Sequence, residues 1–393
     1  MPGPATNSCR LRHPRFVIVR FLHSADIHLA PALGYLEDRA KRAQRREDFA
    51  RQVDRLPSLV RTHAAEAVVL AGDVFDRDLP GQPEAARLAA ALAECAVPVL
   101  VAPGTHDAWR AGGVWDRPWP ANVTVFSEDR WTPVAVGEAA FYGLASRGRA
   151  REGGLFGGLP ARVEGARFHV GIAHASLLWA DIAGKVDPKN LPFEEADLDR
   201  LFFDYLALGD HHALRVVRRP GGLVAAYPGS PEGLSLDPAE AGTRHMLLVD
   251  LREGLPPEVT PLPVNLREVF FDSIPLDDLQ HESAGDLVEA VRRRLSAAAG
   301  ADRLARIDLT GVIHHPLGVD PSTLGETTAD QFFWLQVRDR TRTLPEAPPA
   351  SNTIRGAFER RLRSRLEAAA SDEERVVAER ALAIGLQALE GQL

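Results

Sequence analysis

Five short segments of the sequence place aspartate and histidine side chains directly after runs of apolar residues. They are Asp26-Ile-His28, Gly72-Asp73-Val-Phe-Asp76, Gly104-Thr105-His106-Asp107, His174 and Gly209-Asp210-His211-His212. Carboxylate and imidazole groups together suit divalent ions such as Mn, Fe or Zn. Residues two apart on an extended chain point the same way, so Asp26 and His28 can bind one ion. Each segment alone is more typical of a polar turn, but five in order indicate a metal-dependent site.

The apolar runs before these segments are predicted to be strands, because they are short, rich in β-branched residues and end at Gly, Asp or Pro. The predicted strands are 16–22, 67–70, 97–101, 123–126, 139–144, 167–173, 205–208, 223–227 and 245–249. Helices are predicted over 39–63 and 83–95. Helices separate only the early strands, which predicts an α/β domain with mixed, layered sheets. Strand ends of such sheets are where active sites collect.

Proline-rich stretches divide the rest of the chain. The stretch 254–263 is interpreted as a linker, and a second break follows at 344–349. Between them, strands near 268–271, 306–313 and 332–338 and a helix over 285–298 predict a smaller α+β unit. Two helices are expected after the second break, the later one starting with the capping pair Ser371 and Glu374. The predicted divisions are a loose tail 1–15, a main domain 16–253, an α+β domain 264–343 and a helical segment 350–393.

The order of the motifs resembles the signature of calcineurin-like metallophosphoesterases: D-x-H, G-D-x-x-D, G-N-H-D, H and G-H-x-H. It extends from Asp26 to His212, about half of the chain. The surrounding residues His23-Ser-Ala-Asp-Ile-His-Leu29 and Tyr227-Pro-Gly-Ser-Pro-Glu232 are similar to DNA-repair exonucleases of the SbcD and YhaO types. The resemblance implies a four-layer α/β sandwich of two mixed sheets flanked by helices, a small α+β capping domain and C-terminal helices.

The resemblance also implies a site for two divalent ions, with Mn favoured. The implied ligands of the first ion are Asp26, His28, Asp73 and His212. Asp73 bridges to the second ion, whose other implied ligands are His174 and the positions of Thr105 and Asp210. Two ions roughly 3.5–4 Å apart clamp phosphate oxygens and convert a bridging water to hydroxide near neutral pH.

Three further residues of the motifs have implied roles. His106 sits beside the scissile phosphate, where it protonates the leaving oxygen or stabilises charge. Asp107 orients the His106 imidazole by a hydrogen bond. Asp76 is interpreted as a residue that fixes the loop and binds no ion.

Two positions depart from the family pattern, and both belong to the second ion. Thr105 replaces asparagine and Asp210 replaces the first histidine of G-H-x-H. A carboxylate binds Mn or Mg well, whereas a neutral hydroxyl is a weak donor. Two hypotheses stay open: a harder second site that favours Mn, or weak binding with low activity. His211 could replace the missing histidine, but on an extended segment its side chain points away from residues 210 and 212.

Two other features have both a functional and a packing interpretation. Trp109, Trp115 and Trp119 follow His106 together with arginines 110 and 117, and such a loop either stacks on bases or packs internally. Trp109 and Arg110 are the candidate substrate-binding residues. Arginines also surround an apolar stripe in the predicted helix near 354–366, which would bind a partner coiled coil, DNA or its own protein.

Composition limits the possible functions. A net charge of −8 excludes a surface that is basic all round, so nucleic acid requires a local basic groove or a second subunit. The two cysteines, Cys9 and Cys95, form no disulfide framework, which favours a reducing, cytoplasmic location. No apolar run approaches the roughly 18 residues of a membrane span, and 16–22 is interpreted as a strand and not a signal peptide.

The resemblance implies Mn-dependent hydrolysis of DNA phosphodiesters, by an exonuclease that works with a separate SMC-like ATPase of the SbcC type. No Walker motif occurs in this sequence, so an ATP-driven step requires another chain. The resemblance alone implies a homodimer. The alternatives are a small-molecule phosphoesterase of the same superfamily and a catalytically weak or inactive scaffold subunit, which Thr105 and Asp210 favour. A nuclease that is active only with its partner is a further alternative.

Overall fold

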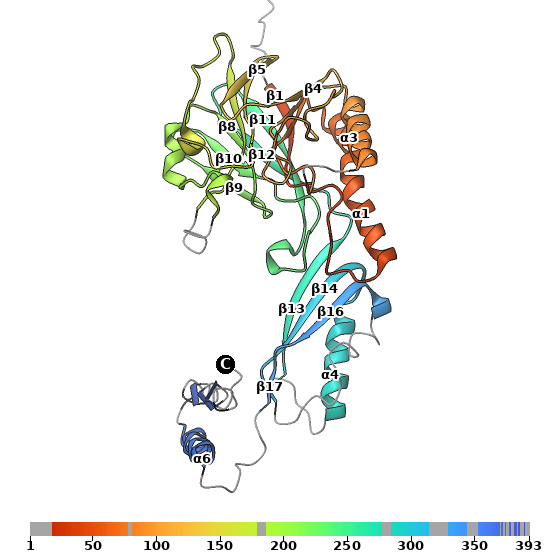
Figure 1. Ribbon diagram of the computed structural model, residues 1–393, viewed down its shortest axis with the longest axis vertical. Helices are drawn as coiled ribbons and strands as arrows, with labels where there is room; N and C mark the ends of the chain where they lie inside the picture. Colours follow the sequence, from red (N-terminus) through yellow and green to blue (C-terminus); the bar gives the residue numbers. More distant parts are fainter. Residues whose placement is uncertain are drawn as a thin grey trace, which may run out of the picture. The chain divides into compact units, whose positions relative to one another are not determined.

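The computed structural model describes residues 18–77, 81–178, 186–276, 284–313, 329–343 and 353–369, with scattered positions from 371 to 389. The chain divides into two compact units (Figure 1). The first consists of Met1–Ser235 and Gly242–Arg267, and the second of Leu236–Ala241 and Glu268–Leu393. The domain boundaries drawn from the sequence stay a prediction.

Two six-stranded mixed sheets form the first unit. One has the order β12-β11-β1-β2-β3-β4, with bounds Glu258–Pro263, His245–Arg252, Ile18–Ser24, Ala67–Leu70, Val99–Val101 and Val123–Val125. The other has the order β5-β6-β7-β8-β10-β9, with bounds Thr132–Val136, Ala139–Leu144, Phe168–His174, Tyr205–Gly209, Val224–Tyr227 and Arg215–Arg218. The strands β1 to β4 are parallel, as are β6, β7, β8 and β10. The antiparallel pairs are β1 with β11, β11 with β12, β5 with β6 and β9 with β10.

The sheets pack face to face through side chains that alternate along each strand. Phe21 of β1 points inward and contacts Phe141 and Tyr205 of the other sheet, each at a ring-centroid distance of 5.6 Å. Its neighbour Leu22 points outward and joins the core under the helices. This alternation is the strand periodicity that places every second residue on the same face.

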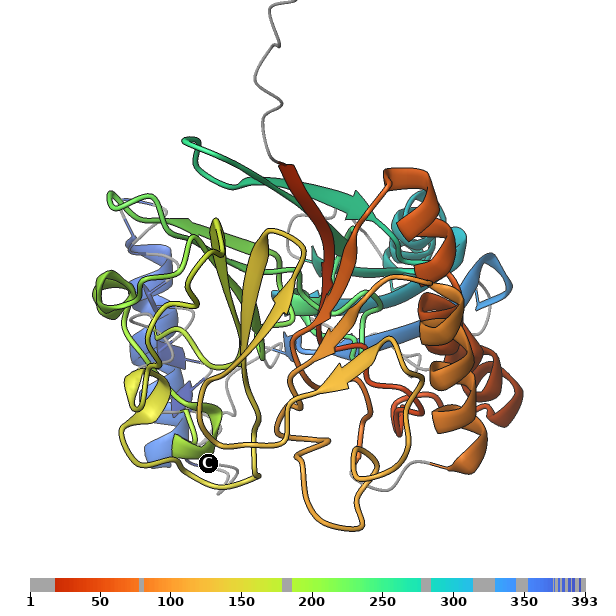
Figure 2. The ribbon, with the colours of Figure 1, turned by 90° about the horizontal axis from the view of Figure 1, so that it is seen from above.

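Helices α1 (Arg39–Asp54), α2 (Leu56–His63) and α3 (Gln82–Glu94) cover the outer face of the first sheet (Figure 2). Over the second sheet, the described covering layer consists of loops and the short 3₁₀ turns Gly154–Phe156, Pro188–Asn190 and Glu195–Arg200. The predicted layered α/β sandwich of two mixed sheets is confirmed.

Two details of the sequence-based prediction are wrong. The single helix over 39–63 is two helices, because Pro57 has no N–H to donate and instead occupies the first turn of α2. The linker interpretation of 254–263 fails because β12 pairs antiparallel with β11. Proline is tolerated there since β12 is an edge strand of its sheet. The edge strands β5 and β9 were also not predicted.

The second unit contains a parallel three-stranded sheet in the order β13-β14-β16, with bounds Glu268–Pro275, Gly300–Thr310 and Phe332–Asp339. Helix α4 (Ala284–Ala297) packs on it through Val291 and Leu295. The short strands β15 (Val312–Ile313) and β17 (Arg342–Thr343) pair with each other, and α6 covers Ile354–Glu367. The predicted α+β composition is confirmed.

Much of the last predicted helix lies outside the described residues. At its predicted start, Ser371 Oγ accepts a hydrogen bond of 3.2 Å from the backbone N–H of Glu374, as the capping pattern requires. Within the described residues, no helix combines the length and the apolar composition that a membrane crossing needs.

A buried polar cluster connects α1 to two later segments of the first unit. Arg45 and Glu232 are both completely buried, with 2.5 Å between Nη1 and Oε2. The other oxygen of Glu232 accepts hydrogen bonds of 2.6 Å from Gln52 and from the backbone N–H of Leu266. Glu232 is the last residue of the motif Tyr227–Glu232 at the end of β10, and its contacts give this residue a structural role.

Replacement of Glu232 by alanine is expected to destabilise the first unit by about 3–5 kcal/mol, because Arg45 would stay buried without its charge partner. Urea unfolding of the full chain measures this loss. The control is Glu94→Ala, which removes the exposed partner of Arg61 and should cost less than about 1 kcal/mol. Equal losses in the two variants would contradict the assignment.

Candidate metal centre

All five Asp and His segments lie at the carboxyl ends of central strands. Strands β1, β2 and β3 of one sheet and β7 and β8 of the other each lead directly into one segment. Because these strands are parallel within each sheet, their ends meet at a common edge. The backbone N–H of Asp26 donates to the carbonyl of Gly72 at 3.0 Å, and that of His28 donates to Asp73 at 3.0 Å. These bonds lock the first two segments together.

The loops at this edge have strained backbone. Asp26, His28 and Asp73 have φ angles of 50°, 48° and 49°, in the left-handed region that L residues seldom adopt. Gly72 has φ of 90°, and a Cβ on it would lie 2.5 Å from Nδ1 of His174. Such strain is typical of functional sites, where the surrounding structure fixes side-chain directions.

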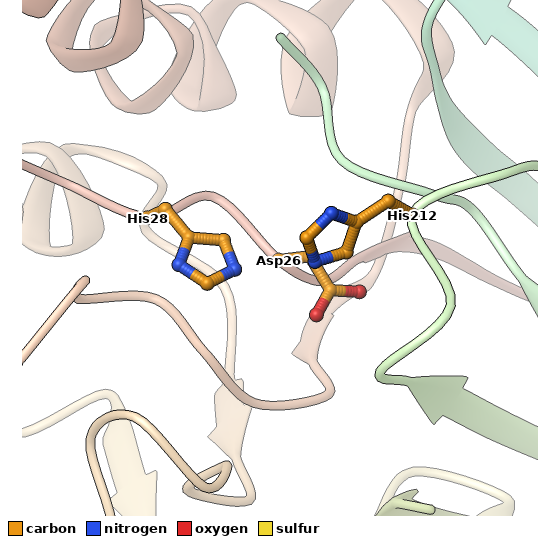
Figure 3. Close-up of side chains that lie close together, drawn as sticks. All are labelled: Asp26, His28 and His212. Atoms are coloured by element: carbon orange, nitrogen blue, oxygen red, sulfur yellow. The ribbon is translucent and has the colours of Figure 1, made fainter. Parts of the chain in front are cut away.

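Six of the predicted site residues converge. Their ligand atoms form three overlapping groups within 4.8 Å: Asp26, His28 and His212; Asp26, Asp73 and His174; His28, Asp73 and His106. Figure 3 shows Asp26, His28 and His212 turned toward one another. Within the cluster His106 is exposed, whereas Asp26, His28, Asp73 and His174 are buried. The cluster therefore has four buried members, with the half-buried His212 and the exposed His106 at its rim.

Two buried imidazoles present the same nitrogen to Asp73. Nδ1 of His28 pairs with the carboxylate of Asp76 at 3.2 Å, and Nδ1 of His174 donates to the carbonyl of Ala71 at 3.1 Å. Their Nε2 atoms lie 3.9 and 3.3 Å from Asp73 Oδ2, and both are buried with no hydrogen-bond partner among the residues that the structure describes. Metal-binding histidines use this arrangement, in which the second nitrogen is held by a carboxylate or carbonyl. The residues thus fit a divalent ion.

Electrostatics at the cluster favour positive charge. Burial lowers the pKa of His174, but Asp73, Asp26 and Asp210 outweigh burial and hold it well above the usual value. Burial acts to raise the pKa of Asp73, yet His174, His28 and His106 together keep it below its ordinary range. Burial also raises the pKa of Asp26. A cation bound between these carboxylates would displace the His174 proton.

The predicted hydrogen bond from Asp107 to His106 is wrong. Asp107 is completely buried and accepts three backbone N–H groups, from Val74 at 2.9 Å, Phe75 at 3.2 Å and Gly104 at 2.8 Å. Burial and the neighbouring Asp73 raise the pKa of Asp107 to about 6. His106 is exposed whereas Asp107 is buried. The Asp107 carboxylate therefore connects the loops after β2 and β3 inside the protein.

The His106 side chain is oriented by different groups. Its Nδ1 donates to the backbone carbonyl of Asp76 at 3.1 Å, and its backbone N–H donates to Asp73 Oδ1 at 2.8 Å. The side chain of Asp76 meanwhile pairs with Nδ1 of His28 at 3.2 Å, which suits a residue that positions this ring. One residue thus positions two histidines, through its carbonyl and its carboxylate.

The altered positions lie next to the cluster but outside its three close groups. Asp210 Oδ1 lies 3.8 Å from Nε2 of His174, and the Asp210 backbone N–H donates to both oxygens of Asp26 at 3.2 Å. Its carboxylate accepts hydrogen bonds from the Ser176 hydroxyl and, at 2.8 Å, from the Asn190 amide. Sequence analysis missed Ser176 and Asn190, because neither residue belongs to a recognisable motif.

His211 does not replace the missing histidine. Its Nε2 donates to the carbonyl of Leu177 at 3.0 Å, and its ring packs on Tyr227 with centroids 4.6 Å apart. Burial lowers the pKa of His211. These contacts engage the His211 ring with Leu177 and Tyr227, outside the three close groups of the cluster.

The tryptophans after His106 mainly pack inside the protein. Trp115 is buried, and it packs on Phe75 and Trp119 with centroids 5.4 and 5.0 Å away. Trp109 is half-buried, and the Arg147 guanidinium covers one ring face at 4.4 Å. Substrate binding by Trp109 and Arg110 stays a prediction.

Comparison with known proteins agrees with this geometry. Residues 19–227 match the calcineurin-like phosphoesterase family. The chain belongs to this family. The matched region contains all five Asp and His segments, and members of the family depend on two metal ions. The predicted resemblance is confirmed.

The relatives within the calcineurin-like phosphoesterases include DNA-repair proteins. Over 301 residues the chain is 29% identical to the DNA double-strand break repair protein Mre11 of Haloferax volcanii, covering 75% of this chain and 62% of that one. Over 91 residues it is 34% identical to the protein of the same name from Aeropyrum pernix, covering 22% and 21%. A dimetal phosphatase from Danio rerio matches with a TM-score of 0.37 and 14% identity, covering 63% of this chain and 99% of that one. The chain thus spans about three fifths of the length of the Haloferax protein.

Replacement of Asp76 by alanine is expected to weaken Mn²⁺ binding at His28 by about 10–100-fold, because the ring would lose the group that holds Nδ1. Calorimetric titration of the metal-free chain with MnCl₂ measures the affinity. Asp116→Ala is the control, since Asp116 is exposed and its carboxylate accepts the backbone N–H of Gly112, far in the chain from the Asp and His segments of β1 and β2. An unchanged affinity in Asp76→Ala would contradict the positioning role.

Proposed function

We propose that this chain is a metal-dependent phosphodiesterase that acts on DNA as a repair exonuclease. The observation that supports this most is the buried Asp and His cluster at the strand ends, with the exposed His106 at its rim. A phosphodiester has the oxygens that ions in such a cluster would bind, and His106 lies where a leaving oxygen could be protonated.

The ligand roles are proposed as the sequence predicted them. Asp26, His28 and His212 would hold the first ion, and Asp73 would contribute to both sites. His174 and Asp210 would hold the second ion, whereas Thr105 would contribute little. When bound, two ions polarise the phosphate and lower the pKa of a bound water. His28 and His174 would bind an ion through Nε2, because their Nδ1 atoms already contact Asp76 and Ala71.

His106 is proposed as the catalytic proton donor. The Asp76 carbonyl accepts hydrogen bonds only, so Nδ1 of His106 carries a proton and Nε2 remains available to exchange one. Asp73 accepts the His106 backbone N–H and thereby ties the position of this ring to the cluster. Asp107 accepts the backbone N–H groups of Val74 and Gly104, and so connects the loops after β2 and β3.

DNA as the substrate is supported by the names of the two relatives, both double-strand break repair proteins. The net charge of −8 favours a second subunit that contributes affinity for the nucleic acid. We propose an SMC-like ATPase of the SbcC type as that subunit, in the cytoplasm, with the nuclease chain as a homodimer. Helix α6 offers a contact for a partner, since Ile354 at its start is 81% exposed and several arginines follow.

A catalytically weak scaffold subunit is the second candidate. It is favoured by Thr105, because a neutral hydroxyl is a weak metal donor at a position where the family pattern has an amide oxygen.

The purified chain is expected to degrade end-labelled DNA in the presence of Mn²⁺, and chelation should abolish the activity. His106→Ala should lower the rate by about 10²–10⁴-fold, the usual contribution of a general acid, while Mn²⁺ binding is retained. His63→Ala, a histidine at the end of α2, serves as the control.

Three results would contradict parts of the proposal. Hydrolysis confined to small phosphate esters would indicate a small-molecule phosphoesterase. DNA binding without hydrolysis, with and without an SMC-like ATPase, would indicate the scaffold. Equal rates for His106→Ala and the unmodified chain would remove His106 from the chemistry.

A further inference from the structure

A cavity of about 640 Å³ lies beside the proposed second-ion position, and Thr105, Ser176, Asn190 and Asp210 all line it. Thr105 stands where the family pattern has asparagine, whose amide oxygen is a good ligand for a hard cation. Asn190 is an asparagine in the same cavity that reaches it from a different segment, the 3₁₀ turn Pro188–Asn190.

The backbone holds Asn190 firmly at this place. Ser176, two residues after β7, donates its N–H to the Asn190 carbonyl at 2.8 Å and accepts the N–H of Phe193 at 3.0 Å. Leu191, directly after Asn190, has φ of 49°, a left-handed conformation that leucine rarely adopts. The turn is therefore fixed to the end of the strand that carries His174, despite its local strain.

The side chain of Asn190 is oriented by one hydrogen bond. Its Nδ2 donates to Asp210 Oδ1 at 2.8 Å, and this same oxygen lies 3.8 Å from Nε2 of His174. The Asn190 Oδ1 atom is buried and has no hydrogen-bond partner among the described residues. Nε2 of His28 and Nε2 of His174 are likewise buried and have no hydrogen-bond partner among the described residues. A buried acceptor without a donor is unfavourable, and a cation would satisfy it.

We propose that Asn190 Oδ1 is a ligand of the second ion and supplies the amide oxygen that Thr105 lacks. The inference rests on the proposed two-ion function. Asp210 can accept from Asn190 and still bind the ion, because each carboxylate oxygen has two lone pairs. The hydrogen bond from Asn190 then orients Asp210 and does not block it. With Asp73, Asp210 and Asn190, the second site is rich in oxygen and prefers Mn²⁺ or Mg²⁺ to Zn²⁺.

Replacement of Asn190 by alanine tests this assignment in the full chain. Calorimetric titration with MnCl₂ should show two ions for the unmodified protein. In Asn190→Ala the affinity for the second ion should fall at least tenfold, with the first unchanged. Electron paramagnetic resonance should show loss of the coupled two-Mn signal. The control is Lys189→Ala, an exposed residue of the same turn. Adding Thr105→Asn to Asn190→Ala should restore the second ion, which distinguishes a lost ligand from misfolding.

The outcomes separate this inference from the proposed function. Two ions of unchanged affinity in Asn190→Ala would overturn the ligand role and leave the phosphoesterase proposal intact. A single ion in the unmodified chain would also overturn it and favour the scaffold candidate. Failure of the unmodified, folded chain to bind any Mn²⁺ would overturn both.

Discussion

The structure is organised around the burial of like charges. Asp26 and Asp73 lie within 4.8 Å of a common histidine, and both are almost completely removed from water. Two carboxylates so placed require positive charge or donated hydrogen bonds, since burial alone strongly disfavours their ionised forms. The raised pKa of His174 expresses the same requirement, because Asp73, Asp26 and Asp210 outweigh its burial. The electrostatic potential of these carboxylates therefore favours a bound cation even without substrate.

The fold meets this requirement mainly with backbone groups. The N–H groups of His106 and Asp210 donate to Asp73 and Asp26, and those of three loop residues satisfy Asp107. Several loops must adopt left-handed backbone to bring these donors inward. Such strain persists only where the surrounding structure over-determines the backbone, and here backbone hydrogen bonds join the loops after β1 and β2.

The two halves of the metal centre are built differently. The half around His28 uses residues that the family motif specifies, with Asp76 positioning the ring. The half around His174 depends on a turn from outside the motifs, which brings Asn190 to Asp210. Under the proposed ligand roles, a carboxylate in place of an imidazole would make this half harder, and the Asn190 amide oxygen would compensate for Thr105.

The sequence by itself determined the layered α/β class, most strands, the order of the Asp and His segments and their meeting at one edge, because local periodicity and strand-end chemistry are encoded in neighbouring residues. It did not determine the edge strands β5, β9 and β12, which pair antiparallel with strands adjacent in the sequence. Proline in β5 and β12 argues against a strand unless the strand is known to lie at a sheet edge, which only the tertiary structure shows. It also gave Asp107 the wrong partner, since the direction of adjacent side chains in a turn depends on backbone angles. Only the tertiary structure revealed the contacts of Asn190 with Asp210 and of Glu232 with Arg45, because these partners lie 20 and 187 residues away in the chain.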